Sequence, residues 1–102
     1  MAKLYALYKT PADPAAFDRY YYATHVPLAK KVPGLRGYDV TTGPVFAPGG
    51  AAPYHLVATL TFDSLAAIQA ALGSPEGQAT AADLANFATG GVELLFADTR
   101  EV

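Results

Sequence analysis

His25 is the residue of this chain best suited to acid-base chemistry. It is one of only two histidines among 102 residues, and it lies between three consecutive tyrosines and a proline. A free imidazole titrates near pH 6.5, so a small shift of its pKa tunes the side chain for proton transfer at neutral pH. His25 is therefore a candidate general acid or base. The alternative is a structural histidine that caps or fills the end of a helix.

Tyr38 is the best candidate for a second polar group beside His25. Pro33 and Gly34 end the segment that carries His25 and turn the chain straight back toward it. A phenol keeps its proton up to about pH 10, so it can donate a hydrogen bond to a developing enolate oxygen. The alternative for Tyr38 is a packing role between neighbouring strands.

The remaining residues offer few other kinds of chemistry. The chain has no cysteine, which excludes a disulfide, a thiolate nucleophile and a zinc–thiolate site. His55 is far from His25 in the sequence and is expected to be exposed at a strand start. No paired carboxylates or phosphate-binding glycine motif accompany the histidines, so we expect no metal and no cofactor. Ser64 and Ser74 are typical of helix starts rather than nucleophiles.

A helix is predicted to carry His25. Asp13–Pro14 is typical of a helix start, with an N-cap followed by proline at the first helical position. Pro27 lacks an N–H and disfavours helical angles at Val26, which predicts that the helix breaks or kinks at His25–Val26 and restarts with Pro27 as its first residue. The predicted apolar face has helical spacing and comprises Phe17, Tyr20, Tyr21, Thr24 and Leu28.

Four strands and two further helices complete the predicted elements. The strands are residues 3 to 9, 35 to 46, 54 to 62 and 92 to 99, with a loose hairpin loop over residues 47 to 53. Asp63 is predicted to cap a helix through Leu65, Ile68 and Leu72, and Ser74–Pro75 to open another with Leu84, Phe87 and Ala88 inward.

The third strand shows the clearest alternation in the sequence. One face is predicted to hold Tyr54, Leu56, Ala58, Leu60 and Phe62, and the other His55, Val57, Thr59 and Thr61.

The order β-α-β-β-α-β predicts an α+β, ferredoxin-like split βαβ fold in one domain over residues 1–102. Its four-stranded antiparallel sheet would carry helices on one face only. The other face is half apolar, with Val57 between His55 and Thr59. Such a face favours packing against the sheet of a second copy, and two sheets could enclose a ligand cavity. The charged fraction of 16% is below the roughly 25% usual for soluble domains, which also favours a homodimer.

Several partners and locations are disfavoured by composition. The net charge is −2 and no basic cluster exceeds Lys30–Lys31, so nucleic-acid binding is not expected. No apolar run approaches the roughly 20 residues needed to span a bilayer. The first residues become charged too quickly to form a signal peptide. We therefore expect a cytoplasmic protein.

Two motifs carry a family resemblance. Thr24–Ala29 (THVPLA), preceded by Tyr20, and Val32–Tyr38 (VPGLRGY) together resemble the EthD family of dimeric α/β-barrel proteins, named for a component of an ethyl tert-butyl ether degradation system. The resemblance implies a ferredoxin-like fold whose sheets pair into a dimeric barrel.

The resemblance also implies a range of activities. The wider superfamily includes lactone isomerases, polyketide cyclases, cofactor-independent monooxygenases and haem proteins. One related group, the methylmuconolactone methylisomerases, uses a histidine and a tyrosine that correspond by motif to His25 and Tyr38. That group also has a pocket cysteine, which this chain lacks.

The leading functional hypothesis is a homodimer that binds a small, largely apolar organic molecule inside the barrel. His25 would transfer a proton and Tyr38 would hold an oxygen during isomerisation, cyclisation or cofactor-independent oxidation in a catabolic or secondary pathway. The alternatives are a non-catalytic binding or accessory protein of a degradation pathway, and a dimer without any ligand. Whether the protein is an enzyme is left open by the sequence.

Overall fold

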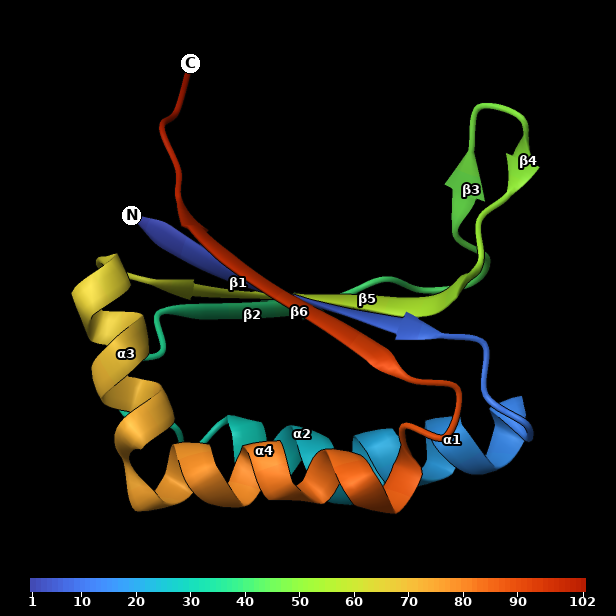
Figure 1. Ribbon diagram of the computed structural model, residues 1–102, viewed down its shortest axis with the longest axis horizontal. Coiled ribbons are helices and arrows are strands. Elements are labelled where there is room, and N and C mark those ends of the chain that lie inside the picture. Colours follow the sequence, from blue (N-terminus) through green and yellow to red (C-terminus); the bar gives the residue numbers. More distant parts are fainter.

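Four strands form one antiparallel sheet in the order β2-β5-β1-β6 in the computed structural model, which describes residues 1–102 (Figure 1). The strands are β1 (Ala2–Lys9), β2 (Gly37–Val40), β5 (Tyr54–Phe62) and β6 (Val92–Asp98). All the helices lie against one face of this sheet, so the predicted α+β, ferredoxin-like class is confirmed.

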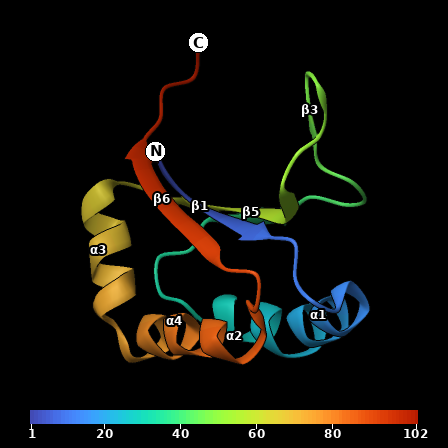
Figure 2. The same ribbon diagram turned by 45° about the vertical axis from the view of Figure 1, so that its right-hand side comes forward.

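The helices form two groups. The first runs through α1 (Pro14–Tyr20), the π-helical turn η1 (Tyr21–His25) and α2 (Val26–Ala29), and the second consists of α3 (Leu65–Gly73) and α4 (Pro75–Phe87). Figure 2 shows the first group and α4 side by side beneath the sheet, with α3 rising at one end of it. None of these helices has both the length and the hydropathy that a membrane-spanning helix requires.

The sheet buries every second side chain of its central strands. β1 and β5 are paired along their length, and the inward residues of both strands are small or apolar. The predicted alternation in β5 is confirmed from Leu56 to Phe62. The fully or nearly buried inward residues are Ala2, Leu4, Ala6, Tyr8, Leu56, Ala58 and Phe62.

A β-bulge changes the alternation at the start of β5. Tyr8 pairs with Leu56 but Lys9 pairs with Tyr54, so His55 is the extra residue. The Tyr54 hydroxyl donates to Glu93 on the outer face of the sheet, at 3.3 Å, and His55 turns toward the helices. The predicted faces of Tyr54 and His55 are therefore wrong, because a bulge re-aims the side chains beside it.

The second predicted strand is shorter than expected. Its sheet pairing ends at Val40, and a separate two-stranded hairpin follows, formed by β3 (Phe46–Ala47) and β4 (Gly50–Ala51). Gly43, with φ of 72°, and the adjacent proline redirect the chain, because proline cannot donate to a strand ladder. The hairpin and the C-terminal residues extend from the sheet on the side away from the helices (Figure 1).

The helix caps differ in one place from the prediction. Ser64, not Asp63, caps α3, because its hydroxyl accepts a hydrogen bond from the Ala67 N–H at 3.0 Å. Asp63 instead pairs with Arg36 at 3.0 Å on the surface. Ser74 caps α4, as predicted from the Ser-Pro pair.

The helix neither breaks at His25–Val26 nor restarts at Pro27, and the predicted irregularity there is a π turn. Val26 has helical angles, φ −58° and ψ −47°, and the chain stays helical from α1 into α2. The Val26 N–H donates to the Tyr21 carbonyl five residues earlier, which makes the turn π-helical. This wider turn accommodates Pro27, whose ring would clash with the carbonyl four residues before it in a regular α-helix.

We predict that Gly77→Ala destabilises the fold by about 1–3 kcal/mol, the usual cost of overpacking. A Cβ at Gly77 would lie 1.9 Å from the Ala71 carbonyl oxygen, because α3 and α4 approach closely there. Gly73→Ala is the matched control, since nothing lies within 4 Å of its Cβ position. Denaturant unfolding of both variants measures the difference, and equal stabilities would contradict the packing argument.

Candidate functional site

The π turn places His25 in the centre of the buried helix face. In a regular α-helix, residues four apart drift around the axis because one turn holds 3.6 residues. The wider turn offsets this drift, so Phe17, Tyr21, His25 and Ala29 all remain buried against the sheet. His25 is only 4% exposed, whereas Thr24, predicted to face inward, is exposed.

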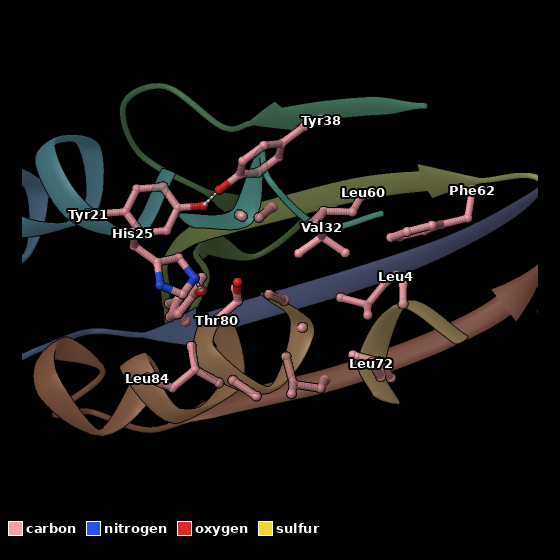
Figure 3. A pocket seen from close by; sticks show the side chains of 18 residues that line it. Leu4, Tyr21, His25, Val32, Tyr38, Leu60, Phe62, Leu72, Thr80 and Leu84 are labelled. Carbon is pink, nitrogen blue, oxygen red and sulfur yellow. Dashed lines mark hydrogen bonds between the residues drawn. The ribbon is translucent and has the colours of Figure 1, made fainter. Parts of the chain in front are cut away.

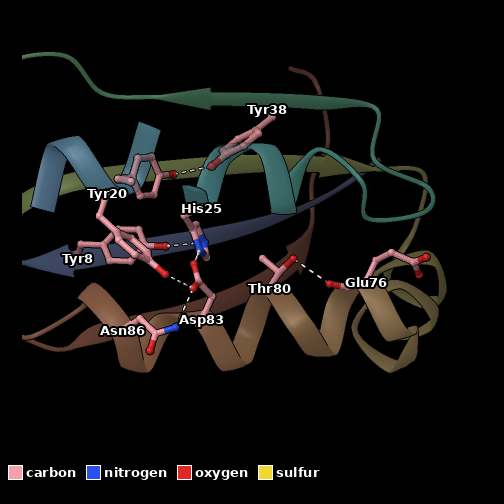
Figure 4. A network of polar contacts seen from close by, with 9 residues as sticks. Tyr8, Tyr20, His25, Tyr38, Glu76, Thr80, Asp83 and Asn86 are labelled. Carbon is pink, nitrogen blue, oxygen red and sulfur yellow. Dashed lines mark hydrogen bonds and ion pairs between the residues drawn. The ribbon is translucent and has the colours of Figure 1, made fainter. Parts of the chain in front are cut away.

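Asp83 on α4 faces His25 and forms a hydrogen bond with one of its ring nitrogens. The His25 Nδ1 lies 2.9 Å from Asp83 Oδ2, and both side chains are buried. The other carboxylate oxygen of Asp83 accepts hydrogen bonds from the Tyr20 hydroxyl at 2.5 Å and from Asn86 Nδ2 at 3.0 Å (Figure 4). Three donors therefore hold this carboxylate in one orientation.

The environment sets the charges of this pair. Burial lowers the pKa of His25 by more than the neighbouring Asp83 raises it, so the imidazole is neutral at pH 7. Burial alone would raise the pKa of Asp83, but the hydrogen bonds from Tyr20, Asn86 and His25 outweigh it and lower that pKa. Asp83 is therefore an anion that accepts the Nδ1 proton of a neutral His25.

This tautomer leaves the His25 Nε2 atom unprotonated, so Nε2 is a hydrogen-bond acceptor. The Tyr8 hydroxyl is the hydrogen-bond partner of Nε2, at the long distance of 3.5 Å. Burial, then the nearby Tyr38 and Asp83, raises the pKa of Tyr8, so its hydroxyl keeps its proton. A neutral Nε2 with such a weak partner can accept a proton from a bound molecule.

Tyr21 and Tyr38 form a second polar pair. Their hydroxyl oxygens are 2.6 Å apart, and neither hydroxyl bonds to another residue. Burial raises the pKa of both phenols, so each keeps its proton at neutral pH. The mutual hydrogen bond uses only one of the two protons. The other is free to donate to the oxygen of a ligand.

One cavity of about 70 Å³ lies between the sheet and the helices, and its lining includes Tyr8, Tyr21, His25 and Tyr38. Figure 3 shows Tyr21, Tyr38 and His25 at one end and Leu4, Phe62 and Leu72 at the other. The sequence predicted a cavity between two paired sheets, whereas this one lies on the helix-covered face of a single chain. Its full lining is Leu4, Ala6, Tyr8, Tyr21, His25, Ala29, Val32, Tyr38, Ala58, Leu60, Phe62, Ala71, Leu72, Gly77, Thr80, Ala81, Leu84 and Leu94.

Both predicted site residues reach this cavity, although no hydrogen bond joins His25 to Tyr38. Their catalytic roles remain predictions. The sequence did not predict that Asp83 and Tyr8 lie beside His25, or that Tyr21 pairs with Tyr38. One signal for Asp83 was available, since it lies four residues before Phe87 on the inward face of α4, where an acidic residue is unusual.

The second histidine lies outside this cavity. The His55 Nε2 atom is 2.8 Å from Asp18 Oδ1 on α1, and its ring packs edge-on against Phe17. It is half-buried, so the expectation of an exposed side chain is wrong. No three His, Asp and Glu side chains lie together in a group that could hold a metal ion.

We predict that the free energy of unfolding falls as the pH drops below 6.5, the ordinary histidine pKa. The unfolded chain then binds a proton that His25 in the folded protein resists, so protonation favours unfolding. The free energy of unfolding continues to fall until the pH reaches the lowered pKa of His25 in the folded protein. Denaturant unfolding across this pH range measures the free energy of unfolding. In His25→Asn this free energy should depend less steeply on pH. An identical slope in the variant would contradict the pKa direction.

Comparisons with known proteins extend over nearly the whole chain. The profile of the EthD domain matches residues 9–91. An uncharacterised 11.0 kDa protein from the thcB–thcC intergenic region of Rhodococcus erythropolis is 43% identical over 103 residues, covering 100% of this chain and 98% of that protein.

Solved structures show the same fold. An EthD family protein from Bacillus halodurans has a TM-score of 0.89 and 36% identity, covering 98% of this chain and 99% of its own. A variant of SnoaB, a cofactor-independent oxygenase from Streptomyces nogalater, has a TM-score of 0.66 at 17% identity, covering 99% and 94%.

A dimeric ferredoxin-like protein of unknown function from Thermobifida fusca has a TM-score of 0.69 at 14% identity, covering 96% of this chain and 90% of its own. At these last two identities the likeness shows the fold alone. The domain match and the two closer relatives show more than the fold, and by them this chain belongs to the EthD family.

Proposed function

We propose that the protein binds a small, largely apolar organic molecule in the cavity beside His25 and transfers a proton on it. The reaction class would be isomerisation, cyclisation or cofactor-independent oxidation, in a catabolic or secondary pathway. The observation that carries this proposal is the buried His25–Asp83 contact of 2.9 Å, which leaves the Nε2 lone pair at a cavity lined mainly by apolar groups.

In this proposal His25 is the general base. Its Nε2 atom takes a proton from a carbon next to a carbonyl group of the ligand, and the electron pair moves to the carbonyl oxygen. The imidazolium that forms is stabilised by the Asp83 carboxylate on Nδ1. Where a carbon–carbon double bond is conjugated with the enolate, return of the same proton to the far carbon of that bond shifts the double bond and restores the carbonyl group, so the isomerisation consumes no cofactor.

Tyr38 and Tyr21 would stabilise the oxygen on which negative charge develops. The spare proton of this hydroxyl pair can be donated to the enolate, and the mutual hydrogen bond at 2.6 Å holds both rings in place. Hydrogen bonds of this kind are strongest in a cavity that excludes water. Tyr38 thus keeps the role predicted from the sequence, and Tyr21 joins it.

A non-catalytic binding or accessory role is the second candidate. It is favoured by the same cavity, whose walls are mainly aliphatic and aromatic, and by the low exposure of His25. In that case His25→Ala would retain the ligand, since apolar contacts would supply the affinity. An enzyme would retain binding in part and lose turnover.

We also infer that two chains pair through the outer face of the sheet. Support comes from the half-buried Tyr5, Leu7 and Val57, which lie together on that face with the exposed Leu95. Apolar side chains of this kind are stabilised when a second sheet covers them. The dimeric description of the Thermobifida fusca structure agrees with this pairing.

Proton transfer can be tested by deuterium exchange into the methyl group of acetophenone, followed by NMR in heavy water. We expect protein-catalysed exchange to fall by about 10²–10⁴-fold in His25→Asn, the usual contribution of a general base. Tyr38→Phe should lower it less, because Tyr21 remains. The control is His55→Asn, since His55 lies outside the cavity.

Unchanged exchange in His25→Asn would contradict the proposed role of His25. Acetophenone that binds without any exchange above the buffer rate would favour the binding role instead.

The pairing can be tested by sedimentation. We expect a mass of twice the 10.6 kDa chain, and a shift toward the single-chain mass in Leu7→Glu, because a carboxylate would be buried in the interface. Thr24→Glu, on the exposed side of the helices, is the control and should remain paired. A native protein that sediments as one chain would contradict the pairing.

A further inference from the structure

The cavity wall contains no charged side chain. None of the seven lysine and arginine residues lines it, and neither does any of the nine acidic residues. Its polar groups are three phenols, the imidazole of His25 and the hydroxyl of Thr80. The Thr80 hydroxyl is already used, because it donates to the Glu76 carbonyl at 2.8 Å.

The nearest charge behind the wall is negative. Asp83 is buried directly behind His25, and its charge is shared among hydrogen bonds rather than cancelled by a cation. A carboxylate ligand would therefore lose its hydration, meet no cation and lie close to another carboxylate. Burial of an ion without a partner costs far more than burial of a neutral carbonyl group.

The polar groups also lie at one end of the cavity. Tyr21, Tyr38 and His25 face one another at that end, and aliphatic and aromatic side chains line the other (Figure 3). Leu72 and Leu94 belong to the lining yet are 38% and 45% exposed, so the apolar end opens to solvent between α3 and β6. A ligand would thus place its oxygen inward and its apolar part toward the opening.

The volume limits the size of the enclosed part. A cavity of about 70 Å³ is roughly half of the about 150 Å³ that encloses benzene in an apolar core, so it encloses a small polar group and only part of a ring. Larger apolar groups fit only where they extend through the opening beside Leu72 and Leu94.

We propose that the cavity selects uncharged ligands that carry one hydrogen-bonding oxygen, such as a ketone or phenol on a ring, and excludes ionised carboxylates. This inference rests on the proposed use of the cavity as a ligand site. It does not require that the bound molecule reacts.

Three probes of similar shape test the selection. Acetophenone carries one oxygen, ethylbenzene carries none, and benzoate is ionised at pH 7. Backbone-amide NMR titrations of the full chain give the dissociation constants. We expect acetophenone to bind about fivefold more tightly than ethylbenzene, because its oxygen accepts one hydrogen bond that ethylbenzene cannot form. Acetophenone should also bind more than about a hundredfold more tightly than benzoate, because the benzoate carboxylate would be buried without a cation.

Thr80→Lys adds a cation to the wall, and Thr80→Met is its uncharged match of similar length. Thr80 is half-buried on α4, so both side chains can point along the cavity toward solvent. Benzoate should bind at least about tenfold more tightly to Thr80→Lys than to Thr80→Met, since an opposite charge offsets its desolvation. Circular dichroism verifies that both variants are folded.

The outcomes separate this inference from the proposed reaction. Acetophenone that binds in the expected order without exchanging its methyl protons supports the selection and contradicts the proton transfer. Benzoate that binds the unaltered protein as tightly as acetophenone overturns the selection, whether or not exchange occurs. Absence of binding by all three probes overturns it as well.

Discussion

The buried contact between His25 and Asp83 is the interaction on which the site depends. It joins two helices that are far apart in the sequence, and it determines which nitrogen of His25 faces the cavity. A buried carboxylate is costly unless it is well paired, and here Tyr20 and Asn86 supply the remaining hydrogen bonds. Removal of either partner would leave a buried polar group unsatisfied, so the contact constrains packing as well as chemistry.

Two backbone features make this contact possible. The π turn at Tyr21–His25 directs the imidazole toward the sheet and α4, where a regular helix would rotate it away. Gly77 allows α3 and α4 to pack closely, which fixes the position of the helix that carries Asp83. Small side chains at Ala6 and Ala58 then leave space in front of His25 that larger residues would fill.

Much of the fold could be predicted because its signals are local. The alternation of inward and outward side chains predicted β5 from Leu56 onward, and the Ser74–Pro75 pair predicted the start of α4. The bulge at His55 could not be predicted, since it depends on register with β1. The effect of Pro27 was predicted as a break or kink of the helix, because the alternative, a π turn held by tertiary packing, leaves no local pattern.

The site was less predictable than the fold. His25 and Tyr38 were singled out from residue type and from the turn between them, and both line the cavity. Asp83 lies 58 residues after His25, and only the packing of α4 against the first helices brings the two together. The location of the cavity likewise depends on how small residues from several elements face one another, which no single segment of sequence records.

The most direct test of the proposed role of His25 is the tautomer of its ring, measured by long-range ¹H–¹⁵N correlation NMR of the imidazole at pH 7. We expect a neutral ring with its proton on Nδ1, directed at Asp83, and an unprotonated Nε2. A ring with its proton on Nε2, or one that is doubly protonated at pH 7, would contradict it. In either case Nε2 could not accept a proton from a molecule in the cavity.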